Sequence, residues 1–529
     1  MLFDKNSEIT TDPQKMADLL QEQFSSVFSD PNSSNVSDPH VFPPPDISSP
    51  LELEEFQISD EDIIKAVSSI PVDSASGPDG VPAVLLRNCA KELCLPLRLI
   101  WNESFESGTV PSFYKYSHIA PLYKKGDRAR AVNYRPVALT SHVIKVYERI
   151  LRGVMVDFLE KNDLLCDNQH GFRAGRSCLT QLLSHVDDIV QGLTKNADTD
   201  AIYLDFANAF DKVDHRLLLS KMKRMGFHEK IVRWIESFLT DRKQCVVLNG
   251  VSSTEAAIIS GVPQGTVLGP LLFILFINDM KLCVTGSMIR IVKDLGVMIA
   301  ADLSWTSHVS AIAQRGGKVA AWVLSAFRTR DRVTMLTLYK SLVRSHLEYC
   351  CPLWNSSKIA DIQVLEGVQR TFTARIAGVQ HLNYWERLKA LNLMSLQRRR
   401  ERYIIIYMWK VLHARCPNNL GIKFSNSSRH GLKAIVPALA KSCSQHNQTL
   451  YDNSLAVIGP RLWNTIPPSL HQIEDPLGFK VKLTEFIRTF PDEPPVNGYC
   501  RRNGNSLLDW SGNKAASLLS GWSTHSMAR

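Results

Sequence analysis

Apolar residues recur at helical intervals towards both ends of the chain. In residues 1–28 they accompany a helix start signal at Thr11-Asp12-Pro13, which predicts one amphipathic helix for this segment. Beyond Val309 the same interval continues to about residue 415, which predicts an almost wholly helical region. Between these segments, Ser59-Asp-Glu-Asp62 resembles a capping box and predicts a further helix start.

The first half of the chain also contains short apolar runs separated by turn residues, a pattern typical of β-hairpins. One hairpin is predicted over residues 117–140, with Lys124-Lys-Gly-Asp127 at its tip. A second is predicted between Gln244–Gly250 and Ala256–Ser260. Ala201–Leu204 is predicted to be a buried strand. Strands and helices are therefore mixed in this part of the chain.

Two helices and a linker complete the outline. Helices are predicted over Ser141–Leu159 and Val267–Met280, and the second is apolar almost all round, which predicts burial. Ser29–Pro50 is rich in Ser, Pro, Asp and Asn and is predicted to be a linker.

The charge of the chain is unevenly distributed. Residues 1–70 contain 14 acidic and 3 basic residues, whereas the remainder contains 38 acidic and 58 basic residues. A basic body indicates a polyanionic partner. No run of about 18 apolar residues occurs, so no membrane span or membrane partner is expected. The N-terminus has no apolar signal region, so an intracellular protein of the nucleus or cytoplasm is expected, not a secreted one.

Asp205 is the first candidate for chemistry, because a carboxylate at the end of an apolar strand is poorly solvated unless it meets a positive partner. It could bind Mg²⁺, which prefers oxygen ligands, or it could cap the helix that follows. Asp211 and Asp214 lie on the following helical turn and are predicted to be structural.

Two polar clusters could meet a nucleotide. The loop Gly261-Val-Pro-Gln-Gly265 is predicted to bring its backbone close to another surface, and Gln264 could then face a base or ribose. Lys124, Lys125 and Arg135 could clamp a triphosphate. The alternatives are an ordinary loop between hairpin and helix and a solvated turn.

The order and the amino-acid sequences of these blocks, taken together, indicate a family more specifically than any single block does. The chain resembles the reverse transcriptase of non-LTR, LINE-type retrotransposons of the jockey-like kind. The blocks that carry the resemblance are Ser76–Pro82, Tyr123–Asp127 with Asn133–Val137, Gln169–Ser177, Ala201–His215, Ser260–Pro270, Val292–Val297, His346–Asn355, Leu365–Arg370 and Tyr451–Pro468.

This resemblance implies an α+β, right-hand polymerase fold. The expected domains are 1–56, an amphipathic helix and linker left from the joint between endonuclease and polymerase; 57–180, fingers; 181–300, an incomplete palm; 301–415, a helical thumb; and 416–529, a C-terminal extension.

The resemblance also implies a nucleotidyltransferase that joins deoxynucleoside triphosphates to a DNA primer on an RNA template, with two Mg²⁺ ions. The residues that match the family's sites are Asp205 and the carbonyl of Phe206 for metal, Phe210 for the ribose, Lys124, Lys125 and Arg135 for phosphates, Gln264 and Gly265 for the nucleotide, and Arg398, Arg399, Arg400 and Arg402 for the duplex backbone.

One block of the family pattern is missing. A strand-turn-strand with paired aspartates is expected between Met280 and Lys293, but residues 281–292 contain no acidic residue. We therefore expect the polymerase to be inactive and the palm to be loosened around the Asp205 strand. The alternatives are a non-enzymatic nucleic-acid-binding remnant and a defective gene model.

Overall fold

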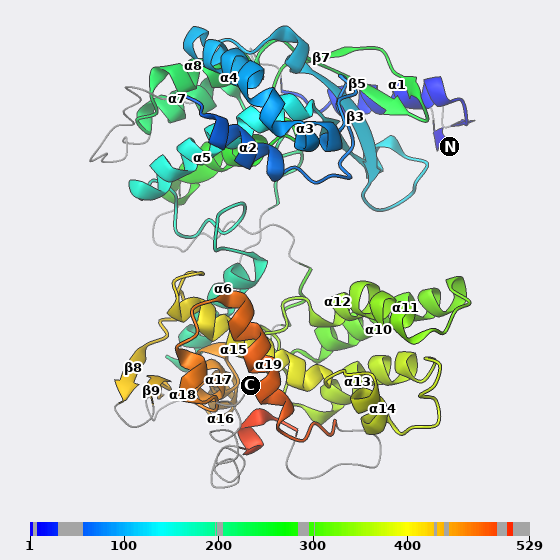
Figure 1. The fold of residues 1–529 in the computed structure, drawn as a ribbon, viewed down its shortest axis with the longest axis vertical. Coiled ribbons are helices and arrows are strands. Elements are labelled where there is room, and N and C mark those ends of the chain that lie inside the picture. Colours follow the sequence, from blue (N-terminus) through cyan, green and yellow to red (C-terminus); the bar gives the residue numbers. More distant parts are fainter. Residues whose placement is uncertain are drawn as a thin grey trace. The chain divides into compact units, whose positions relative to one another are not determined.

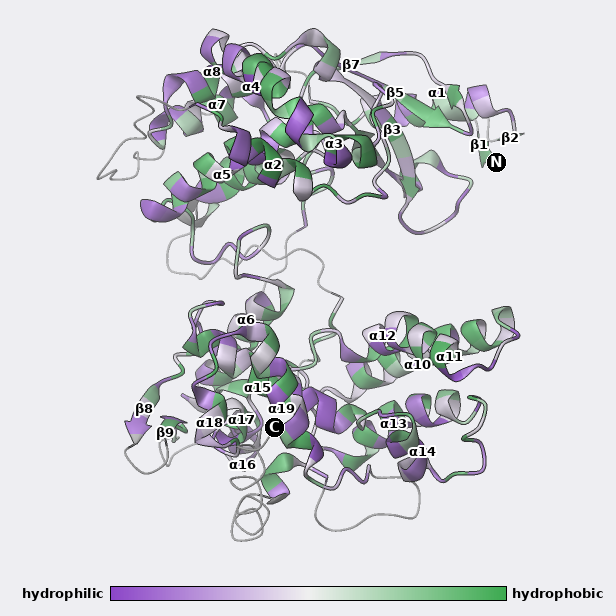
Figure 2. Cartoon of the chain, in the orientation of Figure 1, coloured by the Kyte–Doolittle hydropathy of each residue, from purple (hydrophilic) through white to green (hydrophobic). Residues whose placement is uncertain are grey.

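The chain forms two compact units in the computed structural model, which describes residues 1–3, 8–29, 57–195, 197, 205–283, 296–300, 302–427, 431–438, 444–494 and 505–510. The first unit comprises Met1–Phe172 and Leu204–Ile289, and the second comprises Arg173–Tyr203 and Arg290–Arg529. Each unit has its own hydrophobic core. The helices of both units contain both hydrophobic and hydrophilic residues (Figure 2), as expected for helices with one face against a core and the other exposed to solvent.

The first unit mixes helices with a five-stranded sheet (Figure 1). Its elements are β1 Leu2–Phe3, β2 Ile9–Thr10, α1 Pro13–Ser25, α2 Asp60–Ser68, α3 Ala83–Asn88, α4 Ala90–Ser107, η1 Ser112–Lys115, β3 Tyr116–Tyr123, η2 Ala131–Asn133, β4 Tyr134–Leu139, α5 His142–Lys161, α7 His215–Arg224, α8 Glu229–Leu239, β5 Arg242–Leu248, β6 Val251–Ser252, β7 Ala256–Ile258, α9 Gly269–Ile277 and η3 Asn278–Cys283.

The second unit is mainly helical. Its elements are α6 Cys178–Thr194, α10 Thr306–Ala326, α11 Arg332–Leu338, η4 Tyr339–Val343, α12 Arg344–Glu348, α13 Ile359–Thr373, α14 Tyr384–Ala390, α15 Leu396–Leu412, β8 Phe424–Ser427, β9 Gly431–Ala434, α16 Gln445–Asp452, α17 Leu455–Trp463, α18 Pro468–His471, α19 Pro476–Arg488 and η5 Leu507–Trp510. No helix among the described residues combines the length and apolar character needed to cross a membrane.

The two predicted hairpins are confirmed. Strands β3 and β4 pair antiparallel, with His118 opposite Leu139 and Tyr123 opposite Tyr134. Strands β5 and β7 also pair antiparallel, with Arg242 opposite Ile258. A parallel pairing of β3 with β5 joins the two hairpins into one sheet, and this pairing has no local signal in the sequence.

The predicted helix over residues 1–28 is wrong before Pro13. Helix α1 begins only at Pro13, because the side chain of Asp12 accepts the N–H of Gln14 and so caps the helix at this point. Upstream of it, β1 and β2 form a short antiparallel pair, with Leu2 opposite Thr10. The predicted linker and the strand Ala201–Leu204 lie outside the described residues, apart from Ser29 at the start of the linker.

Helix α6 packs on the second unit. Its residues Leu182 and Leu183 enter the core of that unit, and Val190 packs with Leu303 and Tyr451. The borders of the two units therefore differ from the predicted domain borders at 180, 300 and 415. The functional names fingers, palm and thumb stay predictions.

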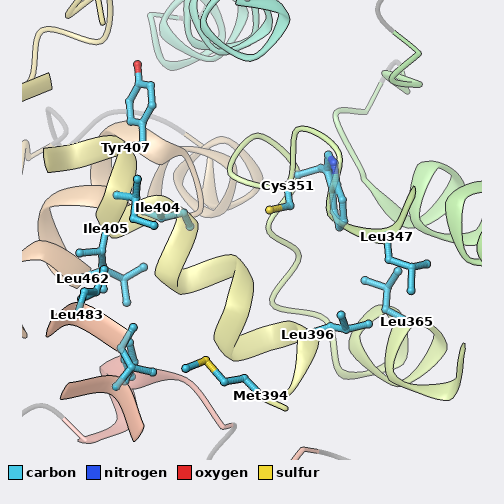
Figure 3. Packing of buried hydrophobic residues seen from close by; sticks show 14 of the residues in the cluster. Leu347, Cys351, Leu365, Met394, Leu396, Ile404, Ile405, Tyr407, Leu462 and Leu483 are labelled. Carbon is cyan, nitrogen blue, oxygen red and sulfur yellow. The ribbon is translucent and has the colours of Figure 1, made fainter. Parts of the chain in front are cut away.

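The core of the second unit surrounds α15 (Figure 3). The core contains Ile404 and Ile405 of this helix together with residues from α12, α13, α17 and α19. Figure 3 shows Leu462 and Leu483 near Ile404 and Ile405, and Leu347 and Leu365 nearer to Leu396. A buried polar cluster lies within the same core: Tyr384 donates to Glu366 over 2.6 Å, and Tyr339 donates to Gln369 over 2.7 Å. Burial raises the pKa of Glu366 to about 7.

Ser59→Ala tests the capping box that begins α2. The Ser59 hydroxyl accepts the N–H of Asp62, and the Asp62 carboxylate accepts the N–H of Ser59. Loss of this cap is expected to cost about 1 kcal/mol, so the α2 amides should exchange with deuterium about fivefold faster. Ser68→Ala, at the other end of α2, is the control and should change exchange less than twofold, as roughly expected for a surface position. Equal exchange in both variants would contradict the cap.

Candidate functional site

The loop Gly261–Gly265 passes directly against strand β4. The N–H of Ala138 in β4 donates to the carbonyl of Gln264 over 2.7 Å. Gly265 has a φ of +114°, and a Cβ at this position would overlap the carbonyl of Ala138. Gly261 has a φ of +90°, and a Cβ there would overlap the backbone of Asp211. The predicted close approach of this loop to another surface is therefore confirmed, and it explains both glycines.

A buried carboxylate holds the C-terminal side of the same loop. Glu148 of α5 is fully buried and accepts the N–H of Val267 over 2.7 Å and that of Leu268 over 2.9 Å. Burial raises the pKa of this carboxyl, whereas the two N–H donors and the nearby Arg242 oppose the rise. The carboxylate thus satisfies N–H groups at the start of α9 that have no partner within the helix.

Asp211 and Gln264 meet in the same place. The Nε2 of Gln264 lies 3.3 Å and 3.4 Å from the two carboxylate oxygens of Asp211. Burial raises the pKa of Asp211 to about 6. Asp214 has the structural role predicted for it, because it accepts the N–H of Leu217 and caps α7. The pairing of Asp211 with Gln264 was missed, because its two residues lie 53 positions apart.

Phe210 lies beside this loop as well. Its ring stacks on Phe273 of α9 with centroids 4.6 Å apart, and its carbonyl accepts the N–H of Val262 over 2.8 Å. His215 contacts the carbonyl of Gly261 over 2.7 Å. The block that starts at Asp205 and the block that contains Gln264 are therefore joined through Phe210, Asp211 and His215.

A small pocket marks this junction. It is bordered by α1, β4, β5, β7, the loop and Asp211. The lining residues are Phe24, Phe28, Ile119, Pro136, Ala138, Asp211, Gln244, Ile258, Ser260, Gly261, Val262, Pro263 and Gln264. Its polar lining residues are Asp211, Gln244, Ser260 and Gln264, and the other lining residues are apolar or glycine.

The predicted phosphate-binding residues lie on the β3–β4 hairpin. Lys124 and Lys125 are exposed near its tip, and the N–H of Lys124 donates to Asn133 over 2.8 Å. Arg135 is exposed in β4, opposite Leu122 and three residues from Ala138. The hairpin thus connects these cations to the strand that contacts the Gln264 loop.

Asp205 and Phe206 are exposed. Asp205 is not the cap of the next described helix, because Asp214 caps α7, so that alternative is wrong. Within the part of the chain that the structure describes, no group of three or more His, Cys, Asp or Glu side chains could hold a metal ion. The described residues therefore do not supply the donor set of a two-ion site.

The arginines predicted to grip a duplex lie largely inside the second unit. Arg398 is fully buried and donates to the carbonyl and side chain of Asn505. Arg400 is buried as well and donates to Asn355 over 3.1 Å.

The two other arginines are also engaged. Arg399 forms an ion pair with Glu348, and Arg402 donates to Thr484 over 2.9 Å and to Lys480. The resemblance implies that these four arginines contact a duplex backbone, whereas in the structure their guanidinium groups contact acceptors within the protein. Helix α15 is central in its unit, so acceptors from other segments surround its arginines.

Comparisons with known proteins show what part of the chain is similar to. Residues 123–298 match the family described as "Reverse transcriptase (RNA-dependent DNA polymerase)". This segment contains the β3–β4 hairpin, the Asp205 block and the Gln264 loop.

Relatives of the chain include transposon proteins of Drosophila melanogaster. The chain is 32% identical to "Probable RNA-directed DNA polymerase from transposon BS" over 42% of its own length and 24% of the relative's. It is 28% identical to "RNA-directed DNA polymerase from mobile element jockey" over 47% of its length and 27% of the relative's. A further relative, from transposon X-element, is 24% identical over 58% and 42% of the two lengths.

Residues 123–298 thus match the reverse transcriptase family, and the chain is similar to proteins of jockey-like, non-LTR retrotransposons, as the sequence blocks predict. The matched region covers between 24% and 42% of these relatives. Because the match covers only part of each relative, we treat the activity, substrates and partners of this chain as proposals.

Gly265→Ala tests the contact between the loop and β4. The added methyl group would overlap the Ala138 carbonyl in a backbone conformation that favours glycine, and we expect a loss of about 3 kcal/mol or more in unfolding free energy. Gly250→Ala is the matched control. It has a φ of +81° but open space around it, so it should cost only about 1 kcal/mol. Urea unfolding followed by circular dichroism measures both, and equal losses would contradict the contact.

Asp211→Asn tests the cost of burying this carboxylate. Because the pKa is raised from 3.8 to about 6, the folded state binds more protons than the unfolded state in this window. The contribution of Asp211 to stability therefore falls as pH rises from about 4 to about 6. Asparagine removes this loss, so the variant should be more stable than the wild type at pH 7 by on the order of 2 kcal/mol. Urea unfolding at pH 4 and pH 7 compares the two, and a difference that is independent of pH would contradict the burial.

Proposed function

We propose that this chain is a reverse-transcriptase-derived protein that binds polynucleotide and has lost RNA-templated DNA synthesis. The observation that carries the proposal is the contrast between two parts of one site. The loop with Gln264 and the hairpin with Arg135 and Lys124 keep a folded arrangement, whereas Asp205 has no paired-aspartate block to complement it in residues 281–292.

Binding and chemistry place different demands on such a site. Cations and polar side chains suffice to hold a polyanion or a triphosphate, because attraction to phosphate needs no reaction geometry. In this proposal Arg135, Lys124 and Lys125 contact phosphates, and Phe210 and Gln264, with Gly265 in the same loop, border the sugar and base. The pairing of Gln264 with Asp211 supports this role, because it fixes the orientation of the amide.

Nucleotide addition demands more. Reaction in line between a primer oxygen and a phosphate uses two metal ions about 3.5–4 Å apart, held by carboxylates on both sides. Asp205, with the carbonyl of Phe206, is one ligand group of this kind, and the donor set among the described residues does not fit a pair of ions. The ions contribute several kcal/mol at the transition state, and about 1.4 kcal/mol corresponds to a tenfold rate. The loss of one carboxylate block thus removes several orders of magnitude in rate.

The experiment separates binding from synthesis in the full chain. A labelled DNA primer annealed to an RNA template is titrated with protein at several salt concentrations, and extension is then measured with deoxynucleoside triphosphates and either Mg²⁺ or Mn²⁺. We expect binding that weakens with salt, and extension no faster than that of Asp205→Ala.

Asp205→Ala serves as the matched control because it removes the remaining catalytic carboxylate of the family pattern and leaves the hairpin cations in place. Primer extension by the wild type that disappears in Asp205→Ala would overturn the loss of synthesis. Absence of any salt-dependent binding would overturn the binding function.

A further inference from the structure

Helix α10 presents an exposed basic face with one large aromatic side chain. Six of its exposed residues, which we call the basic strip, are Gln314, Arg315, Lys318, Ala321, Trp322 and Ser325. Arg315, Lys318 and Trp322 recur at intervals of three and four residues, so they share one side of the helix. Trp322 is 56% exposed, whereas the other tryptophans with described side chains are buried or half-buried.

The opposite face of α10 fixes the strip in place. Val309, Ile312 and Val323 are buried in the core of the second unit, and Gly316 lies tightly against Leu347. Figure 1 shows α10 among α11, α12 and α13, and α10 contacts α12 and α13 directly. A side chain on this helix is therefore presented by a rigid scaffold.

The strip has no acidic residue of its own. From Leu303 to Arg330 the sequence contains no Asp or Glu. Carboxylates on the neighbouring helices α12 and α13 have partners other than Arg315 and Lys318: Glu348 pairs with Arg399, Asp361 accepts from Ser356 and from Thr306 at the start of α10, and Glu366 accepts from Tyr384. The positive charges of Arg315 and Lys318 are therefore not neutralised by these groups.

A tryptophan beside uncompensated cations suits an unpaired nucleic acid better than a duplex. The flat face of an indole can stack on a base only where that base is not already covered by its neighbours, and such stacking tolerates any base. Lys and Arg nearby then contact the phosphates. An acidic protein surface would use the cations but would leave the exposed indole without a matching partner.

We propose that the basic strip of α10 binds an unpaired stretch of polynucleotide, with Trp322 stacked on a base and Arg315 and Lys318 at phosphates. This inference rests on the proposed polynucleotide-binding function and assigns it a surface on the second unit. The buried arginines of α15 do not provide that surface, whereas α10 does.

The test uses fluorescence anisotropy of the full chain with oligo(dT) and oligo(U) of 20 nucleotides and with a 20-base-pair DNA duplex. Trp322→Ala is expected to bind both single strands about tenfold more weakly, and Trp322→Phe, which keeps a ring, should lose less than threefold. Duplex binding should change less than twofold. A loss confined to one oligonucleotide identifies DNA or RNA as the strand bound.

A second variant tests the charges. Arg315→Gln combined with Lys318→Gln is expected to reduce the slope of log K against log salt by about 1.4 for single strands. The controls are Phe113→Ala, an exposed aromatic residue of η1 in the first unit, and Lys482→Gln, an exposed lysine of α19 that pairs with Glu485. Both controls should bind as the wild type does. Thermal unfolding of each variant confirms that the fold is kept, since the substituted side chains are exposed.

The outcomes separate the two proposals. The role of the basic strip is overturned if the wild type and Trp322→Ala bind polynucleotide equally well. It is also overturned if Trp322→Ala loses the same affinity for duplex as for single strands. In both cases the proposed function stands. Displacement of oligo(dT) by poly-glutamate at equal charge concentration would also contradict binding by the basic strip, because charge alone would then explain the affinity. A wild type that binds no polynucleotide overturns the proposed function itself.

Discussion

The first unit depends on a single buried carboxylate. Glu148 of α5 accepts two N–H groups at the start of α9, and the loop that precedes them is held on its other side by the hydrogen bond from Ala138 to Gln264. Burial of a charge is costly unless it is hydrogen-bonded. Here the two N–H donors and the buried Arg242 offset part of that cost, and the pKa of Glu148 stays raised. The arrangement of the Gln264 loop, and with it the position of Asp211 and Phe210, follows from these contacts.

The second unit places its polar groups differently. Arg398 and Arg400 lie in the interior, where Asn505 and Asn355 provide acceptors, and Glu401 accepts the N–H of Leu507 over 2.9 Å. These contacts tie residues 505–510 to α15 across about a hundred positions of sequence. Other cationic side chains of this unit, such as Arg315 and Lys318 of α10, are exposed to solvent. Arginine therefore forms internal hydrogen bonds on α15 and provides surface charge on α10.

The separation of binding from chemistry has a physical basis in this molecule. Phosphate attraction and base stacking are contributed by single side chains on folded elements, and each acts largely alone. A pair of metal ions requires several carboxylates in one place, so the removal of one block has a large effect. A chain can therefore keep the surface that meets a polynucleotide after the reaction is lost, which is the situation that the proposed function describes.

The sequence by itself determined the elements whose hydrogen bonds are local. Both hairpins, the cap at Ser59 and the tight loop between Gly261 and Gly265 were predicted, because their signals lie within a few residues of one another in the sequence. The family blocks also predicted the match of residues 123–298 to the reverse transcriptase family.

Only the tertiary structure decided which charged residues are buried and which distant residues meet. The pairing of Asp211 with Gln264, the packing of α6 on the second unit and the burial of Arg398 depend on contacts between segments far apart in sequence. A run of arginines has the same pattern whether it faces solvent or a set of internal acceptors. The acceptors for Arg398 come from residues about a hundred positions away, and their position is fixed only when the chain is folded.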